Sequence, residues 1–221
     1  MDSVYCYPGT NILINKLGEQ TQLFNEYEKE LSSARYYELQ KTPIKGLFDT
    51  KHLCSIHEYL FQDMYEWAGK FRTVDIAKND LFCLSHLLAS YMTDICSRLA
   101  KDNYLIGIPR VQHIAKMADY YGDINAAHPF REGNGRSLRV FTEMLGKVSG
   151  LEINFDLATE QELLQASVQS FSHSNKGLVD IFQKVSSPIS KTEQIKNCKA
   201  ILPTSLANKM VTKIKNLDIS R

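Results

Sequence analysis

A histidine, a glutamate and two arginines lie close together in the middle of the chain. The segment reads His128-Pro129-Phe130-Arg131-Glu132-Gly133-Asn134-Gly135-Arg136-Ser137-Leu138-Arg139. His128 is its one side chain that exchanges a proton near neutral pH, as a general base must. Glu132 is a lone carboxylate, and Mg²⁺ commonly binds one or two carboxylates together with substrate phosphates. Taken singly, each residue is more often structural or solvated, but their spacing predicts proton abstraction beside a phosphate site.

The residues from Gly133 onward predict an anion-binding site. Gly133 and Gly135 allow backbone angles that other residues avoid, so free backbone N–H groups can converge on a phosphate. Arg136 and Arg139 lie on one face of a helix that is expected to begin at about Asn134, a good N-cap type. A helix N-terminus is electropositive and normally favours acidic neighbours. Arginines gathered there indicate a bound polyanion, whereas an isolated arginine would be a solvated charge.

Two helices are expected to present this segment as the loop between them. Apolar residues recur at helical spacing upstream (Val111, Ile114, Ala115, Ala118, Tyr121) and downstream (Leu138, Phe141, Met144, Leu145, Val148). Pro129 disfavours helical angles for His128, so the first helix should end there. Further helices are expected at about residues 19–40, 50–65 (capped by Asp49 or Thr50), 84–99, 159–173 and 176–185, with residues 150–154 as a connector. His52 and His57 are interpreted as surface or packing residues.

The segment from His128 to Arg139 resembles the signature of the Fic (filamentation induced by cAMP) family at every position that the family fixes. The resemblance covers roughly residues 5–186. It implies an all-α fold, a Fic-type helical bundle with a short β-hairpin flap. It also implies a nucleotidyltransferase, a protein adenylyltransferase that moves AMP from ATP to a Ser, Thr or Tyr hydroxyl of a target protein (AMPylation).

The resemblance assigns a role to each residue of the signature. His128 becomes the catalytic base and Glu132 the ligand of Mg²⁺. The expected nucleotide-binding residues are Phe130, Gly133, Asn134, Gly135, Arg136, Arg139, Ile76 and Lys78, with Arg136 at the β-phosphate and Arg139 at the γ-phosphate. Phe130 is expected to point into the core and hold the loop. Asn134 is expected to add its side-chain amide to the backbone donors.

The stretch Arg72–Leu84 is the expected flap. Arg72, Val74 and Ile76 fall on one side of an alternating segment, and residues 81–84 can return as a second short strand after the turn residues 78–80. On the residues alone, a plain loop is an equal alternative. The resemblance implies that the flap binds an extended segment of the target by strand addition.

The remaining composition is that of an ordinary globular protein. Its 221 residues are 43% hydrophobic and 23% charged, with a formal net charge of +1, which suits one domain with an extension. The chain has no apolar run of membrane-spanning length and no secretory signal. Five cysteines without a Cys-x-x-Cys pair favour reduced thiols over disulfides or a zinc site. We expect a cytoplasmic protein with a Fic domain and N-terminal arm at residues 1–186.

The last segment, residues 187–221, forms a basic extension in this interpretation. It carries seven basic and two acidic residues, hence a net charge of +5. Leu206, Met210, Ile214 and Leu217 repeat at helical spacing, which predicts one amphipathic helix. A basic tail can bind nucleic acid, but a solvated extension is the favoured interpretation.

The N-terminal arm and first helix resemble the antitoxin-controlled toxins of the family. Many Fic proteins carry an inhibitory Ser/Thr-x-x-x-Glu-Gly/Asn motif, and this chain has no match to it. The resemblance therefore implies a separate, small antitoxin whose glutamate competes for Arg139, and type II topoisomerase subunits as targets. Three alternatives remain open: a protein kinase like the death-on-curing toxins, a non-catalytic nucleotide-binding or scaffold protein, and a nucleic-acid binder that uses the tail.

Overall fold

The structure is a computed structural model that describes residues 4–18, 23–78, 81–171 and 174–217, and within them it is mostly helical. The α-helices are α1 (Leu23–Lys41), α2 (Thr50–Phe61), α3 (Leu88–Lys101), α4 (Arg110–Ala127), α5 (Asn134–Ser149), α6 (Glu160–Phe171), α7 (Lys176–Val185), α8 (Lys191–Ile201) and α9 (Thr204–Asn216). Three short 3₁₀-helices, η1 (Ser85–Leu87), η2 (Asn103–Leu105) and η3 (Phe155–Leu157), and two strands, β1 (Leu151–Ile153) and β2 (Ser186–Pro188), complete the elements. The predicted helical fold class is confirmed.

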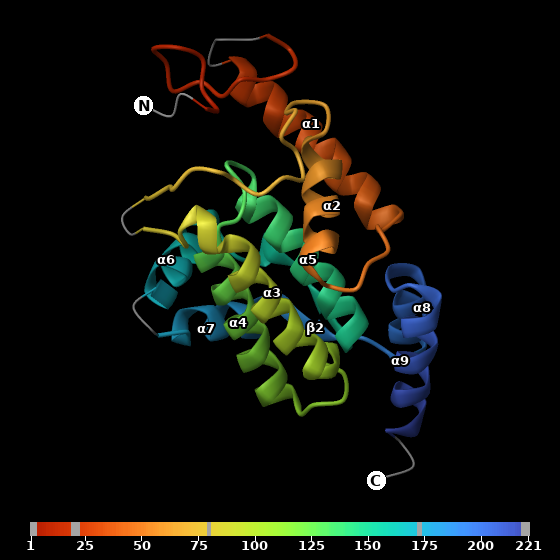
Figure 1. Ribbon diagram of the computed structural model, residues 1–221. Helices are drawn as coiled ribbons and strands as arrows, with labels where there is room; N and C mark the ends of the chain where they lie inside the picture. Colours follow the sequence, from red (N-terminus) through yellow and green to blue (C-terminus); the bar gives the residue numbers. More distant parts are fainter. Residues whose placement is uncertain (1–3, 19–22, 79–80, 172–173, 218–221) are drawn as a thin grey trace.

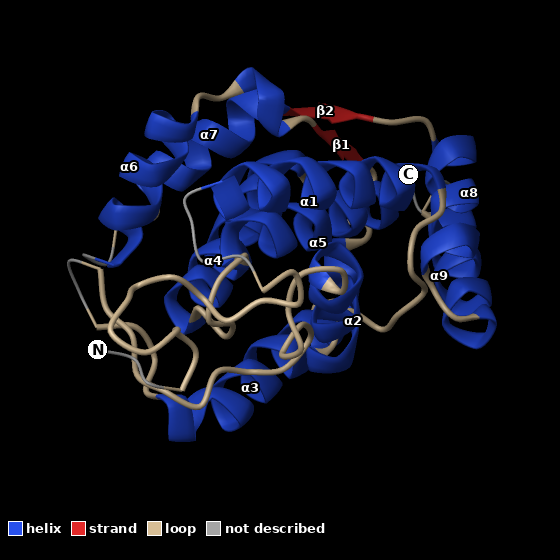
Figure 2. Ribbon diagram, turned by 90° about the horizontal axis from the view of Figure 1, so that it is seen from above, coloured by secondary structure: helices blue, strands red, loops and turns tan. Residues whose placement is uncertain are grey.

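Helix α5 is the central element of the bundle (Figure 1). Helices α2, α4 and α8 and strand β1 all pack against it, and α1 passes over it in the view from above (Figure 2). Twelve of its 16 residues are buried, whereas a surface helix buries only one stripe. The N-terminus of α5, which carries the two signature arginines, is therefore fixed by neighbours on several sides.

The loop between α4 and α5 has the boundaries that the sequence predicts. Helix α4 ends at Ala127, and His128 follows with φ 46° and ψ 59°, in the left-handed region. Asp49 caps α2 by accepting a hydrogen bond from the His52 backbone N–H at 2.8 Å. One detail was wrong: the N-cap of α5 is Gly133, at φ 77°, and Asn134 is the first helical residue.

The regular strands lie outside the flap. Strands β1 and β2 pair antiparallel, with Leu151 opposite Pro188, so the predicted connector at residues 150–154 contains a strand. In the described part of the flap, one isolated β-bridge joins Ala77 to Leu81, and the Phe82 backbone N–H donates to the Ile76 carbonyl at 3.2 Å. The flap thus consists of two extended segments. Asn79 and Asp80 of the predicted turn lie outside the described residues.

The C-terminal segment forms two helices, α8 and α9, where the sequence predicted one. Cys198, Ile201 and Ile214 are fully buried and belong to the same core as the rest of the bundle. The Gln194 side chain donates to the Val148 carbonyl at 2.9 Å, so α8 closes the end of α5 that lies away from the signature (Figure 1). Within the described residues, every helix is too short or too polar to cross a membrane.

Candidate active site

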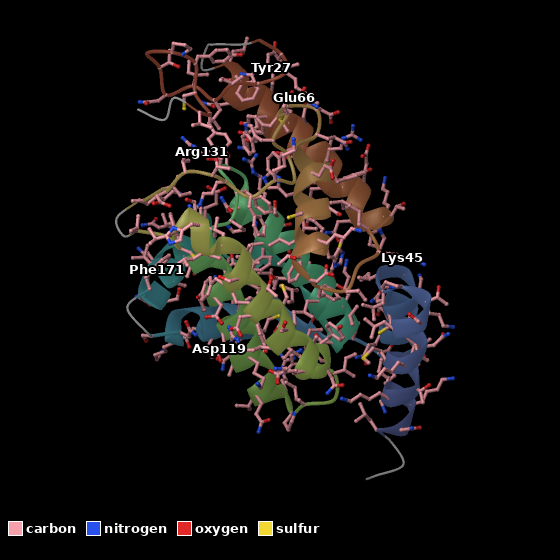
Figure 3. All side chains as sticks on the ribbon, viewed as in Figure 1. Tyr27, Lys45, Glu66, Asp119, Arg131 and Phe171 are labelled. Atoms are coloured by element: carbon pink, nitrogen blue, oxygen red, sulfur yellow. The ribbon has the colours of Figure 1, made fainter. Side chains whose placement is uncertain are left out.

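One cavity of about 1190 Å³ brings together the signature loop, the flap and α6. The predicted site residues that line it are Ile76, Lys78, His128, Glu132, Gly133, Asn134, Gly135, Arg136 and Arg139. The opposite wall comes from α6, including Leu163, Leu164 and Val168. Arg131 of the loop and Phe171 of α6 also line the cavity, and Figure 3 labels both.

His128 stands at the end of α4 with its imidazole held beside the flap. The ring stacks on Phe82, with centroids 3.9 Å apart and planes 16° apart. Its Nδ1 lies 3.3 Å from the Asn125 carbonyl, which favours the tautomer that has a proton on Nδ1 and a free lone pair on Nε2. Burial lowers the pKa of His128 to about 4, against the opposing effect of the Asn125 carbonyl. At pH 7 the imidazole is therefore neutral and can accept a proton.

Phe130 lies in the core beneath the loop, as expected, and it does not line the cavity. Its ring is fully buried and stacks on His57 of α2, with centroids 3.8 Å apart. Its side chain therefore supports the loop from the core, and a nucleotide contact at Phe130 stays a prediction. His57 was interpreted from the sequence as a surface or packing residue, and in the structure it also makes two hydrogen bonds. His57 accepts from the Gly69 N–H at 2.8 Å through Nδ1 and is 3.0 Å from the Glu132 carbonyl through Nε2, so it fixes the loop backbone.

The Asn134 side chain shapes the loop from within. Its Oδ1 accepts from the Phe130 N–H at 2.8 Å, and its Nδ2 donates to the Phe130 carbonyl at 2.7 Å. One N–H of the amide is thus engaged with the loop, and phosphate binding by the second N–H stays a prediction. Gly133 is required next to it: a Cβ there would lie 2.3 Å from Cζ of Phe61, and its φ is positive. The Gly133 N–H already donates to Glu132 Oε1 at 2.9 Å.

Arg136 reaches from α5 to α1. Its guanidinium donates to Glu28 Oε1 and to Ser32 Oγ, each at 2.9 Å, and lies 4.7 Å above the centre of the Phe61 ring. Burial raises the pKa of Glu28, and the charge of Arg136 opposes that rise. Glu28 is not among the cavity-lining residues, so it supports Arg136 from behind. Sequence reasoning missed Glu28, which is one of several glutamates on a polar helix.

Arg139 differs from Arg136 in having no hydrogen-bond or ion-pair partner among the described residues. It is half-buried and lines the cavity. The side chain of Glu132 is 48% exposed and lies 3.7 Å from Arg136. The cavity therefore holds a neutral base, a free carboxylate oxygen and a free guanidinium, which together can bind a nucleotide's phosphates beside a nucleophile.

Comparisons with known proteins identify relatives of this arrangement. Residues 47–145 match the Fic/DOC family. The chain is 40% identical over 169 residues to the protein adenylyltransferase VbhT of Bartonella schoenbuchensis, which covers 76% of this chain and 35% of that protein. It is 33% identical over 192 residues to a probable protein adenylyltransferase Fic of Salmonella typhimurium, which covers 86% of this chain and 94% of that protein. The chain thus spans about a third of the first relative and nearly all of the second.

Solved structures share the fold. The N-terminal Fic domain of a VirB-translocated effector from Bartonella quintana, with bound ADP, is 28% identical and superposes with a TM-score of 0.77 over 83% of this chain and 94% of that chain. BepC from Bartonella tribocorum, with bound AMPPNP, has a TM-score of 0.80 over 84% of this chain and 97% of that chain, at 24% identity. The second likeness concerns the fold alone.

Proposed function

This chain belongs to the Fic/DOC family, and from that premise we propose that it transfers AMP from ATP to a hydroxyl group of a target protein. Its relatives are named for this nucleotidyltransferase activity. The observation that carries the proposal is the convergence of neutral His128, Glu132 and unpaired Arg139 on one cavity. A scaffold protein would not need a neutral base there.

In the proposed reaction, Nε2 of His128 takes the proton of a Ser, Thr or Tyr hydroxyl. The oxygen attacks the α-phosphorus of ATP, the bond from that phosphorus to the bridging oxygen breaks, and pyrophosphate leaves. The first backbone N–H groups of α5 are unsatisfied helix donors, and with Arg136 and Arg139 they face the phosphates. Because His128 has Phe82 stacked on its ring, the base is held in a fixed orientation.

Mg²⁺ fits the donors at Glu132. Within the described residues, no group of three or more His, Cys, Asp or Glu side chains could hold a metal by itself. Glu132 supplies one half-exposed carboxylate at the cavity, and a nucleotide's phosphates supply the remaining oxygens, as is usual for this ion. When bound, Mg²⁺ supplies positive charge that offsets the phosphate charge. Glu132→Ala should raise the Mg²⁺ concentration needed for half-maximal rate, and an unchanged metal titration would remove Glu132 as the ligand.

The extended flap, Arg72–Leu84, is the proposed binding site of the target segment. Val74, Ile76 and Lys78 of the flap line the same cavity as His128, so a strand added along the flap would present its hydroxyl to the base. We propose type II topoisomerase subunits as targets and the cytoplasm as the place of action, on the resemblance to antitoxin-controlled toxins. In this proposal the Fic domain comprises residues 1–186 and the basic extension residues 187–221.

A small antitoxin protein is the proposed inhibitor. Unpaired Arg139 supports this proposal, because a partner's glutamate and a γ-phosphate would compete for its guanidinium. The purified chain should then modify itself with ATP and Mg²⁺ when no partner is present. If it is inert alone and becomes active after removal of residues 187–221 or of the arm, the inhibition is internal.

The decisive experiment incubates the purified chain with ATP, Mg²⁺ and a bacterial lysate, and identifies modified proteins by mass spectrometry. Transfer of AMP adds a nucleotide mass, whereas a kinase adds a phosphate, so the two reactions give different products. His128→Ala is the matched control, since it removes the base and leaves the phosphate-binding residues in place. Phosphate on the target, or AMP transfer undiminished in His128→Ala, would overturn the proposal.

A further inference from the structure

Arg72 is a buried cation that touches no reacting group in the proposed mechanism. Its side chain is fully buried, and a carboxylate oxygen of half-exposed Asp75 lies 4.0 Å from it. A guanidinium loses much solvation free energy on burial, so a structure keeps one buried only where its N–H groups are well used. Burial also lowers the pKa of Arg72, although an arginine remains charged at any ordinary pH.

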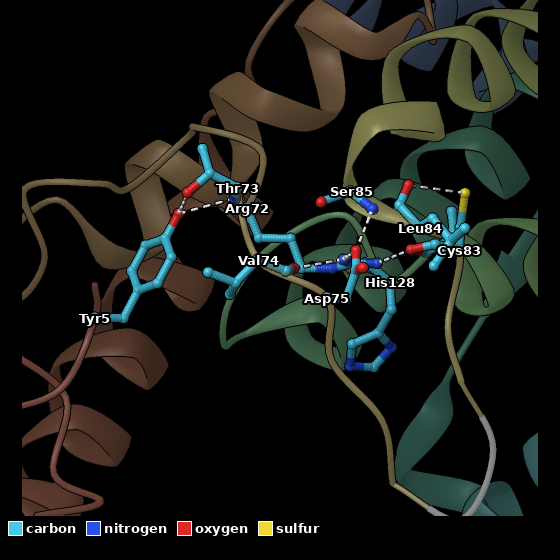
Figure 4. A network of polar contacts seen from close by, with 10 residues as sticks. Tyr5, Arg72, Thr73, Val74, Asp75, Cys83, Leu84, Ser85 and His128 are labelled. Atoms are coloured by element: carbon cyan, nitrogen blue, oxygen red, sulfur yellow. Dashed lines mark hydrogen bonds and ion pairs between the residues drawn. The ribbon is translucent and has the colours of Figure 1, made fainter. Parts of the chain in front are cut away.

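The guanidinium donates to four backbone carbonyls from two separate segments. Figure 4 shows Arg72 between Val74 and Cys83 of the flap and His128 of the loop. In the flap it donates to the carbonyl of Val74, at 2.7 Å, and to that of Cys83. At the end of α4 it donates to the carbonyls of Ala127, at 3.2 Å, and His128, at 2.9 Å. These last two belong to the carbonyls that a helix leaves unsatisfied at its C-terminus, where a positive charge is favoured.

The contacts with the loop extend to the residue after the base. The Arg72 backbone N–H donates to the Pro129 carbonyl at 2.8 Å, so Arg72 binds three consecutive carbonyls around His128. The left-handed conformation is unfavourable for a residue other than glycine, and these bonds support it at His128. Through Cys83, Arg72 also fixes the residue next to Phe82, whose ring stacks on the imidazole.

We propose that Arg72 is a positioning residue that sets the flap in register with His128, so that a hydroxyl bound at the flap meets the base. The inference rests on the proposed AMP transfer, although the contacts that carry it do not. Removing these bonds frees both the flap and the backbone of the base. The phosphates of ATP bind at α5 and the glycines, whose contacts Arg72 does not make, so ATP binding should change much less than transfer even though Ile76 and Lys78 of the flap line the same cavity.

Arg72→Lys tests this positioning role, because lysine keeps the charge but cannot reach four carbonyls in two segments. We expect kcat for AMP transfer to fall about 10- to 100-fold, as for a small misplacement of a reacting group, and the Kd for ATP to stay within about twofold. Arg98→Lys is the matched control: Arg98 lies on α3, pairs with Asp94 and Asp123, and does not line the cavity. It should leave both quantities unchanged.

An NMR titration of the His128 ring gives a second measurement that does not depend on turnover. The charged groups that act on this ring are Lys78 of the flap, Glu132 of the loop and Arg72, and all keep their charge in Arg72→Lys. If Arg72 keeps the ring beneath the flap, the His128 pKa should rise in the variant by more than about one unit toward 6.5. A pKa and a kcat that both match the wild type would overturn the proposal.

The proposal can still be tested if the wild type shows no activity or if Arg72→Lys does not fold. If no AMP transfer occurs even in the wild type, the proposed function fails, while the titration still tests Arg72. If Arg72→Lys does not fold, the guanidinium N–H signals of the wild-type protein decide. If the Arg72 signals exchange with water much more slowly than those of Arg98, the proposed positioning role is supported. Rapid exchange of the Arg72 signals overturns it.

Discussion

The two ends of the loop between α4 and α5 are held by different forces. At the base end, His128 is fixed by backbone carbonyls that accept from buried Arg72 and by the stacked ring of Phe82. At the phosphate end, Arg136 is fixed by an ion pair with Glu28 of α1, and Arg139 is left unpaired within the described residues. At the base end the positive charge of Arg72 is fully buried and bound to backbone carbonyls, whereas at the phosphate end the two arginines are half-buried and line the cavity.

This difference follows from the chemistry proposed at each end. A base that is neutral at pH 7 needs burial and a fixed direction, and a cation placed directly on its imidazole would compete with the incoming proton. A phosphate site needs a cationic side chain that can contact the ligand and is not neutralised by a carboxylate of the protein. Substitutions at one end should therefore affect catalysis, and those at the other should affect nucleotide affinity and stability.

The largest effect is expected at the base end, from His128→Ala. The rate of AMP transfer should fall by about 10²–10⁴-fold, because no other group takes the proton. The Kd for ATP, measured by calorimetry, should be nearly unchanged, because the phosphate end is intact. Loss of nucleotide binding together with activity would mean that the two ends are not separable.

Arg139→Ala tests the phosphate end. Removal of the guanidinium should lower kcat/KM for ATP by about 10- to 100-fold, because one charged hydrogen bond to the phosphates is lost. Because Arg139 has neither a hydrogen bond nor an ion pair within the described part of the chain, the free energy of unfolding should change by less than about 0.5 kcal/mol.

Its matched control is Arg136→Ala, one helical turn away. This variant leaves Glu28 buried without its cation, and should destabilise the fold by about 1–3 kcal/mol in urea unfolding. Equal stability losses at both arginines would contradict the distinction between a paired and a free cation.

Glu28→Gln asks how α1 contributes to the phosphate end. The variant keeps the size of the side chain but removes the charge that orients the Arg136 guanidinium, so KM for ATP should rise about 2- to 10-fold. The value of kcat should hold, because the base end is untouched. A lower KM would instead show that Glu28 competes with the phosphate for Arg136.

The smallest effect is expected from acidification. His128 has a pKa lowered to about 4 by burial, so its neutral form persists as pH falls and is lost only as pH passes through about 4. Between pH 8 and pH 5.5, kcat/KM should therefore change by less than about twofold on account of His128. An acid limb near 6.5 that disappears in His128→Ala would show that the base is exposed during turnover.

Local signals made much of this fold predictable. Pro129 marks the end of α4, Asn134 the start of α5, and Asp49 caps α2. The pairing of β1 with β2 joins three-residue segments about 35 positions apart along the chain, and such short, non-local strands carry no periodicity. The sequence analysis also missed helix α8 of the tail. Its packing on α5 joins residues far apart along the chain.

The site was predictable in its residues but not in its contacts. The signature placed His128, Glu132, Arg136 and Arg139 together, yet their partners come from α1, α2 and the flap, far along the chain. Arg72 left one signal: it shares the apolar side of its extended segment with Val74 and Ile76, and an arginine on that side must find acceptors. Glu28 left none, because a glutamate on a polar helix is ordinarily solvated.

The wall of the cavity formed by α6 has a consequence for evolution. Only Ala166 of that helix is buried, and Leu164 and Val168, which line the cavity, are 57% and 42% exposed. Exchanging such side chains costs a fold little, usually less than about 0.5 kcal/mol. Mutations on α6 can therefore change what the cavity accepts at little cost in stability, whereas mutations in the loop opposite would alter the predicted catalytic residues.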